Sequence, residues 1–265
     1  GKDEYFVASD ASPFIEYTNR SIYLEDNEMA VISREKGLKM YSIPDNTRVD
    51  LNVQELQLSI EKIEKGGYDH FMLKEIYEQP DSLRQCINGR LDRVRGNGRL
   101  GGLNLTPLEL SKLPHVRLLG CGTAYHAAEI GGLLIESLAR VPSVAHIASE
   151  FRTNEPVVNP NALHFAISQS GETADTLAAL NYAKEKDYLS TLTICNVPTS
   201  SLARESDFSL FTNAGPEIGV ASTKAFTTQL AGLMLLALSL AKSRGLNPKL
   251  RGRIVQALRL LPETI

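Results

Sequence analysis

Three hydroxyl side chains and one amide gather in a single short segment, at Ser168, Gln169, Ser170 and Thr173. An apolar run at 162–167 precedes this segment and a helical pattern follows it, which is typical of a turn between a buried strand and a helix. The first N–H groups of a helix lack partners and the helix dipole is positive there, so a phosphate monoester can bind in such a turn without a lysine.

The alternative is an ordinary turn without a ligand. Ser170 would then be the N-cap, Gly171 would relieve backbone strain, and Glu172 would lie in the first helical turn. The pattern alone leaves both interpretations open, since short motifs also occur by chance.

The bulk composition excludes several classes of protein. With 265 residues, of which 43% are hydrophobic, the chain is long enough for one large domain or two smaller ones with a full core. A net charge of −3 argues against a nucleic-acid-binding protein, which would carry a basic excess. Neither the three cysteines nor the five histidines have metal-ligand spacing, so we expect no disulfides, no metal and a reducing, cytoplasmic setting.

The most apolar stretch, 230–240, is about half as long as a membrane span and is expected to be a buried helix. We therefore expect no membrane partner. Because this helix is apolar on nearly all sides, we expect the core to cover one side and another subunit or domain to cover the other, so a homodimer is expected. The chain opens at Gly1 without a methionine, which suggests a fragment; a natural short protein and a split gene product stay open.

The first fifty residues consist of short strand-like runs between turn residues, at 5–8, 21–24, 29–32 and 38–41. They predict a small antiparallel meander. Helical periodicity follows around 58–63, and a helix is expected at about 81–91. Arginines make 84–99 locally basic, so this stretch is either an anion-binding patch or, as we favour, a solvated linker with glycine punctuation.

From His115 onward, strand-like and helical segments alternate. Strands are expected at 116–121, 143–148, 163–168, 191–196 and 208–211, and helices at 124–138, 173–186 and 222–241. This alternation predicts βαβ units in a doubly wound parallel sheet, an α/β fold. Ligands bind at the carboxyl ends of such strands, so the turns at 120–123 and 168–173 and the loop before Ser222 are expected to converge on one cleft.

Two glycines after the first of these strands, Gly120 and Gly122, invite a dinucleotide interpretation. Tyr125 occupies the place of the third glycine, and no acidic residue closes the next strand, so a nicotinamide cofactor is disfavoured. Thr123 can still donate its hydroxyl to a ligand there.

Several other residues outside these turns do not by themselves indicate chemistry. Glu217 and Lys224 flank a loop that enters a helix; either residue could reach the cleft, but nothing local marks either as a titrating group. His126 and His164 are expected on a helix face or in the core rather than as ligands. The final segment, with Leu250, Ile254, Leu258 and Leu261 on one face, predicts an amphipathic helix.

Three segments together resemble the glucosamine-6-phosphate synthase family, the glutamine–fructose-6-phosphate amidotransferases. They are CGTAYHA at 121–127, SQSGETADTL at 168–177 and AGPEIGVASTKAF at 214–226. A fourth segment, KEIYEQP at 74–80, resembles this family's passage from its glutaminase part to its isomerase part. The resemblance covers essentially the whole chain, and the second and third segments are far more specific than a pair of glycines.

The resemblance implies a flavodoxin-like sugar-isomerase (SIS) domain at 111–265, a linker and helix at 66–110, and a β-rich tail of an Ntn-type glutaminase domain at 1–65. In this family a cysteine of the glutaminase domain liberates ammonia, and two SIS domains use it to convert fructose 6-phosphate to glucosamine 6-phosphate without metal or organic cofactor. The glutaminase cysteine and the second SIS domain, which supplies the general-base glutamate, a lysine at the sugar and the ring-opening histidine, have no counterpart here. No catalytic residue is therefore expected in this chain.

The resemblance also implies substrate-binding residues. Those expected to bind the phosphate are Ser168, Gln169, Ser170 and Thr173; those expected to line the sugar are Thr123, Ala124, Val220 and Ser222. The family often has serine at position 124, so one neutral hydrogen bond of about 1 kcal/mol is lost and weaker binding is expected. The chain is expected to bind fructose 6-phosphate or glucosamine 6-phosphate as part of a cytoplasmic transferase and to turn over nothing alone.

Two alternatives remain. One is a non-catalytic SIS sugar-phosphate sensor, which a DNA-binding helix-turn-helix would support, although 84–99 lacks a convincing two-helix pattern. The other is a related deglycase or isomerase, which would not need the β-rich first fifty residues.

Overall fold

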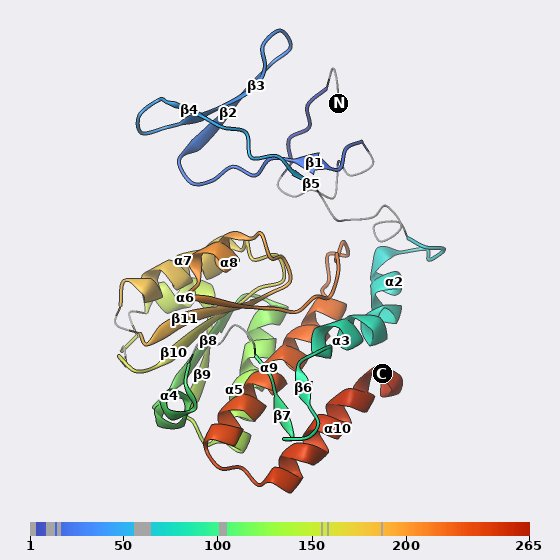
Figure 1. Ribbon diagram of the computed structural model, residues 1–265, viewed down its shortest axis with the longest axis vertical. Helices are drawn as coiled ribbons and strands as arrows, with labels where there is room; N and C mark the ends of the chain where they lie inside the picture. Colours follow the sequence, from blue (N-terminus) through green and yellow to red (C-terminus); the bar gives the residue numbers. More distant parts are fainter. Residues whose placement is uncertain are drawn as a thin grey trace. The chain divides into compact units, whose positions relative to one another are not determined.

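The computed structural model describes residues 4–8, 14, 17–55, 65–100, 105–154, 156–157, 159–186 and 188–265. The chain divides into two compact units, Gly1–Gly67 and Tyr68–Ile265. Each unit has its own sheets (Figure 1).

The first unit contains small antiparallel sheets. The strands are β1 (Arg20–Ser21), β2 (Glu28–Ser33), β3 (Gly37–Ser42), β4 (Arg48–Val49) and β5 (Gln54–Glu55). β3 pairs antiparallel with both β2 and β4, as in the predicted meander. β1 covers only the start of the run predicted at 21–24, and it pairs with β5 rather than with β2. Residues 5–8, predicted as a strand, are not in a strand, and the helical periodicity around 58–63 lies outside the described residues. Met40 is buried, whereas Met29, Val31 and Ile32 are exposed, so this sheet encloses little core.

A five-stranded parallel sheet forms the centre of the second unit, which confirms the α/β prediction. The strands are β8 (Val116–Gly120), β9 (Ser143–Ile147), β10 (Leu163–Ile167), β11 (Ser190–Cys195) and β12 (Phe208–Phe211), each within one residue of expectation. Their order is β12-β11-β10-β8-β9, and every neighbouring pair is parallel. This is the flavodoxin-like order, in which the chain reverses direction across the sheet between β8 and β10. Ligands of such folds bind at the carboxyl ends of the strands beside this switch point.

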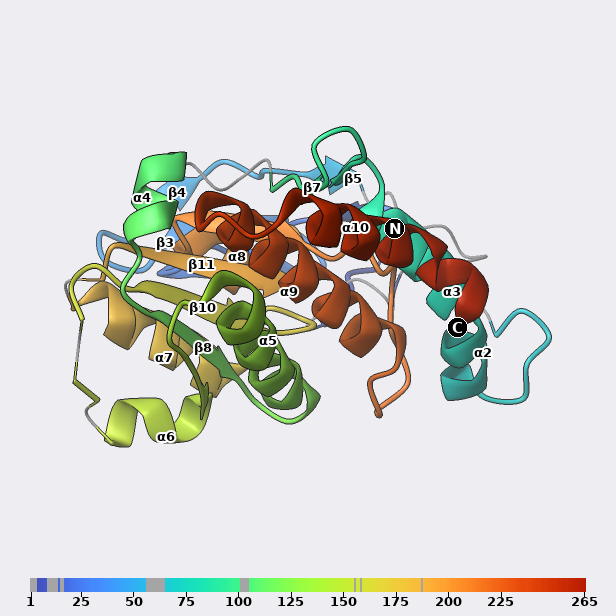
Figure 2. The same cartoon turned by 90° about the horizontal axis from the view of Figure 1, so that it is seen from below.

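Helices cover both faces of the sheet (Figure 2). α5 (Thr123–Ala139) and α9 (Lys224–Ser243) share one apolar core with the strands. On the other face lie α6 (Ala148–Thr153), α7 (Ala174–Lys184) and α8 (Ser201–Glu205). Of these, α6 and α8 were not predicted, because helices of six and five residues are too short to show helical periodicity.

The apolar helix α9 is enclosed by the chain's own elements. α5 packs along one side, and α3 (Gln79–Ile87) and α10 (Pro248–Thr264) pack on others. Its length and composition would allow it to cross a membrane, but 72% of its apolar window is buried within the chain, as in the core helix of a folded domain. The apolar surface that led us to expect a homodimer is therefore already covered.

The second unit begins with α2 (Phe71–Tyr77), and α3, β6 (Leu91–Asp92), β7 (Asn97–Gly98) and α4 (Pro107–Lys112) follow. Two of the arginines here pair with nearby carboxylates: Arg84 pairs with Asp81 at 2.7 Å, and Arg99 pairs with Asp92 at 3.0 Å. These local pairs favour the linker interpretation over an anion-binding patch.

The last helix packs with most of its expected apolar face. Leu258 is buried, and Ile254 and Leu261 pack against the same cluster, whereas Leu250 is 38% exposed.

Candidate functional site

Two turns at the switch point line a partly open cavity of about 160 Å³. It is lined by Cys121, Thr123, Ala124, Ile167, Ser168, Gln169, Ser170, Thr173 and Gln229. Six of the eight residues expected to bind substrate are among them. No lining residue is a lysine, arginine, aspartate or glutamate, so an anion here would be met by N–H groups and hydroxyls.

Hydrogen bonds hold the two turns beside each other and beside the next strand. The Thr176 hydroxyl on α7 donates to the Cys121 thiol of the β8–α5 turn, with a distance of 3.8 Å between oxygen and sulfur. The Asn196 N–H, just after β11, donates to the Gln169 carbonyl at 3.0 Å. The carboxyl ends of β8, β10 and β11 thus contribute to one assembled region.

Serine and threonine hydroxyls organise the β10–α7 turn from within. Ser168 Oγ accepts a hydrogen bond from the Gly171 N–H at 3.0 Å and lies 3.2 Å from Thr173 Oγ1. Ser170 Oγ accepts from the Glu172 N–H at 3.1 Å. Gly171 has φ +71°, a conformation that side chains disfavour, which explains the glycine at this position.

The N-cap of α7 is Thr173, not Ser170 as the ordinary-turn interpretation required. The Thr173 side chain makes no capping hydrogen bond to α7, so its hydroxyl stays directed to the turn. Glu172 precedes the helix rather than lying in its first turn, and its Oε1 accepts from the Ser201 N–H at 2.8 Å. Glu172 therefore connects the turn to the start of α8, outside the set of cavity-lining residues.

The β8–α5 turn brings backbone close to the cavity. A Cβ at Gly120 would lie 2.7 Å from the Tyr125 nitrogen, so only glycine allows the helix to start this near the strand. Gly122 is the N-cap of α5, and Thr123 and Ala124 begin the helix at the cavity wall. Ala124 is buried and presents a methyl group, not the hydroxyl of a serine, at the cavity wall.

The remaining two predicted residues, Val220 and Ser222, do not line this cavity. Val220 is fully exposed on the loop before α9. The Ser222 hydroxyl donates to Glu217 Oε2 at 2.9 Å. The other Glu217 oxygen accepts from the N–H groups of Thr223 and Ala225, at 2.9 Å and 3.1 Å. Glu217 therefore caps α9.

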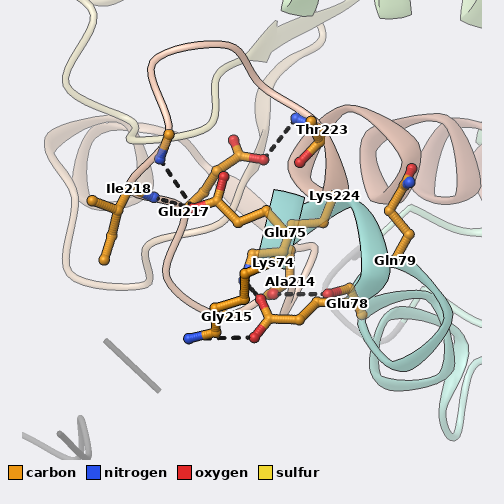
Figure 3. A network of polar contacts seen from close by, with 12 residues as sticks. Lys74, Glu75, Glu78, Gln79, Ala214, Gly215, Glu217, Ile218, Thr223 and Lys224 are labelled. Carbon is orange, nitrogen blue, oxygen red and sulfur yellow. Dashed lines mark hydrogen bonds and ion pairs between the residues drawn. The ribbon is translucent and has the colours of Figure 1, made fainter. Parts of the chain in front are cut away.

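A second carboxylate fixes the same loop from α2. Glu75, which is 2% exposed, accepts hydrogen bonds at Oε1 from the N–H groups of Ile218 at 2.6 Å and Gly219 at 3.0 Å. Figure 3 shows Glu75 beside this loop, with Glu217 capping its far end.

Lys224 also has a structural partner. Its ammonium, buried at the start of α9, lies 2.6 Å from Glu78 Oε2, and Lys74 lies 3.6 Å from Glu78 Oε1 (Figure 3). Sequence reasoning missed Glu75 and Glu78, because their partners lie more than 140 residues further along the chain.

Gln229 on α9 was also missed as a lining residue. It is 2% exposed, although its helix neighbours are mostly apolar. A single amide within an otherwise apolar helix was the available signal, because a buried amide needs polar partners.

The predicted structural histidines lie away from the cavity lining. His164 is completely buried, and burial, then Arg117 and His146, lower its pKa to about 3, so it is neutral at physiological pH. His126 lies on the surface of α5, 3.0 Å from Glu129. Within the described part of the chain, no group of three or more His, Cys, Asp or Glu residues could hold a metal ion.

Comparison with known proteins finds a family match over the part of the chain that contains this site. Residues 109–239 match the family model of the SIS domain. The chain is 47% identical over 246 residues to the glutamine–fructose-6-phosphate aminotransferase [isomerizing] of Chlorobaculum tepidum, covering 92% of this chain and 39% of that protein. It is 46% identical over 262 residues to the protein of the same name from Idiomarina loihiensis, covering 99% and 42%. It therefore spans about two fifths of the length of these relatives.

A solved structure shows the same architecture. The C-terminal domain of glucosamine-fructose-6-phosphate aminotransferase from Francisella tularensis superposes with a TM-score of 0.71 at 42% identity, covering 76% of this chain and 56% of that one. The chain is therefore a SIS-domain protein, homologous along essentially its whole length to part of the glutamine–fructose-6-phosphate aminotransferases.

Proposed function

We propose that this chain is the hexose-phosphate-binding part of an enzyme that makes glucosamine 6-phosphate from fructose 6-phosphate and glutamine. The observation that carries the proposal is the cavity at the switch point, where Ser168, Gln169, Ser170 and Thr173 lie together at the start of α7. The name of the relatives supplies the reaction and the ligand class.

The phosphate would bind at the β10–α7 turn. Hydroxyls and helix N–H groups can donate to phosphate oxygens, and the positive end of the helix dipole favours the dianion. Hydrogen bonds to a charged group contribute about 1.5–3 kcal/mol each, so a few of them suffice for binding without a lysine. Thr123 and Ala124 would face the sugar from the neighbouring turn, and the roles of Val220 and Ser222 at the sugar follow from the family resemblance.

The domain assignment follows the same resemblance. Residues 1–65 would be the tail of a glutaminase domain, 66–110 a linker, and 111–265 the first SIS domain. Ammonia release, Schiff-base formation and proton transfer would use a glutaminase domain and a second SIS domain, so we assign no catalytic residue here. We infer a cytoplasmic location for the complete enzyme, with no metal or organic cofactor. A homodimer stays a prediction, although the apolar surface of α9 that suggested it is covered within the chain.

Calorimetric titration of fructose 6-phosphate into the chain and into Ser170→Ala tests the phosphate site. We expect saturable binding to the unaltered chain and at least about tenfold weaker binding to the variant, since one hydrogen bond to a charged oxygen contributes about 1.5–3 kcal/mol. Ser137→Ala, an α5 serine outside the cavity lining, is the control and should bind as the unaltered chain does. Equal affinities for all three proteins would refute the assignment of the phosphate site to this turn. Steady formation of glucosamine 6-phosphate by this chain alone would refute the inference that the catalytic groups lie in other domains.

A further inference from the structure

One polar group at the cavity is left without a partner. The side-chain oxygen of Gln229, Oε1, is enclosed and has no hydrogen-bond partner among the described residues. The residue belongs to the second turn of α9 and lines the cavity, and none of the other lining residues is charged. Buried polar atoms in folded proteins are nearly always hydrogen-bonded, so an enclosed, unpaired carbonyl beside a cavity indicates a partner that the cavity receives.

The neighbouring residue on the helix shows that this is not a general property of α9. Thr228 is also fully buried, but its hydroxyl donates to the carbonyls of Lys224 and Ala225 at 2.9 Å each. Thr228 thus satisfies its polar group within its own helix and does not line the cavity. Gln229 has no such local bond at Oε1, and its longer side chain reaches the cavity wall.

The chemistry of Oε1 specifies the kind of partner. An amide oxygen accepts hydrogen bonds and donates none. A phosphate dianion likewise offers only acceptor oxygens, so the two cannot bond to each other. A sugar hydroxyl can donate to Oε1 while its phosphate group remains on the donors of the β10–α7 turn.

We propose that Gln229 is a specificity-determining residue whose Oε1 accepts a hydrogen bond from a hydroxyl of the bound hexose phosphate. This inference rests on the proposed function, because it assumes that a hexose phosphate occupies the cavity. Gln229 supplies selection for the sugar, and the turn at Ser168 and Ser170 supplies affinity for the phosphate. Alkyl phosphates without hydroxyl groups gain nothing from Gln229.

Calorimetric titration of two ligands, fructose 6-phosphate and ethyl phosphate, tests the proposal. Gln229→Leu removes the acceptor at similar volume, and Gln229→Met is a second variant in case the branched side chain disturbs α9. Thr228→Val is the matched control, since it changes a buried polar residue one position away. Loss of one neutral hydrogen bond predicts about fivefold weaker binding of fructose 6-phosphate to both Gln229 variants, with ethyl phosphate binding unchanged.

The outcomes separate this inference from the function on which it rests. If the unaltered chain binds neither ligand, the proposed function fails. If it binds fructose 6-phosphate and the Gln229 variants bind it equally well, the inference alone fails. An equal loss of affinity for both ligands would also overturn it, because it would assign the Gln229 amide to the phosphate. Thr228→Val should bind both ligands as the unaltered chain does, and a fivefold loss there would show that the effect comes from disturbance of the helix.

Discussion

Gly171→Ala provides a sharp test of the proposed phosphate turn. Gly171 has φ +71°, and a Cβ on this backbone would lie 2.1 Å from Ser200 Oγ and 2.4 Å from Ser200 Cβ. Ser200 is 1% exposed and caps α8, so it has no open space into which it can retreat. The added methyl group must therefore displace backbone at the start of α7 or α8.

The magnitude follows from two separate terms. A non-glycine residue in the left-handed region costs about 1–2 kcal/mol. Forcing an additional carbon into a packed site costs about 1–3 kcal/mol. We therefore expect Gly171→Ala to lower the free energy of unfolding by about 3 kcal/mol. Because the displaced backbone also holds Ser170 and Thr173, fructose 6-phosphate should bind at least tenfold more weakly.

Gly245→Ala separates the two terms. Gly245 has φ +82°, but nothing lies within 4 Å of a Cβ built there, so only the conformational cost of about 1–2 kcal/mol applies. In the double variant Gly171→Ala/Ser200→Gly the collision is removed, and glycine at an N-cap costs only a few tenths of a kcal/mol. The double variant should therefore recover most of the collision energy.

Urea unfolding followed by circular dichroism measures these free energies, since the chain has no tryptophan to serve as a fluorescent reporter. The reasoning is refuted if Gly171→Ala is destabilised no more than Gly245→Ala, or if Ser200→Gly brings no recovery.

Three further predictions follow from the same structure. Glu75→Gln replaces two charge-assisted hydrogen bonds to the N–H groups of Ile218 and Gly219 by neutral ones. Urea unfolding should show that the free energy of unfolding falls by about 2 kcal/mol in this variant and stays unchanged in the exposed control Glu263→Gln. Equal stabilities of the two variants would contradict this. The pKa of His164 is lowered from 6.5 to about 3 in the folded chain, so the unfolded chain binds the proton first as pH falls. His164 alone should then lower the free energy of unfolding by about 2 kcal/mol between about pH 7 and about pH 5. His164→Leu should reduce the fall by this amount in urea titrations at the two pH values, and an unchanged fall would rule out this source. Ala124→Ser restores a hydroxyl at the cavity wall, so calorimetry should show about fivefold tighter binding of fructose 6-phosphate, and no gain would remove Ala124 from the sugar contacts.

The parallel sheet could be predicted because its strands are continuous apolar runs followed by glycine or polar turns. Val116–Gly120 and Leu163–Ile167 are buried along their whole length, so both strands can be recognised in the sequence as apolar runs. The meeting of their two turns follows from the general position of ligand sites in doubly wound folds. Ser168, Ser170 and Thr173 lie in one turn, close together in the sequence, so they could be predicted together as candidate binding residues.

The rest of the site depends on contacts between distant segments. Gln229 reaches the cavity from a helix that begins more than fifty residues after the Ser168 turn, and no local spacing marks that approach. The loop with Val220 and Ser222 is positioned by Glu75, which lies 143 residues before Ile218. Periodicity reports which residues are buried, but it does not report which buried carboxylate meets which loop.

The uncharged lining of the cavity has a consequence for discrimination among metabolites. Without a lysine or arginine at the wall, the lining exerts no long-range attraction that would concentrate nucleotides, polyphosphates or other anions around the opening. A bound phosphate would then be held by short hydrogen bonds, which weaken steeply when donor and acceptor are displaced. In the proposed function, selection among phosphorylated metabolites would therefore depend on the geometry of these short contacts rather than on the charge of the cavity lining.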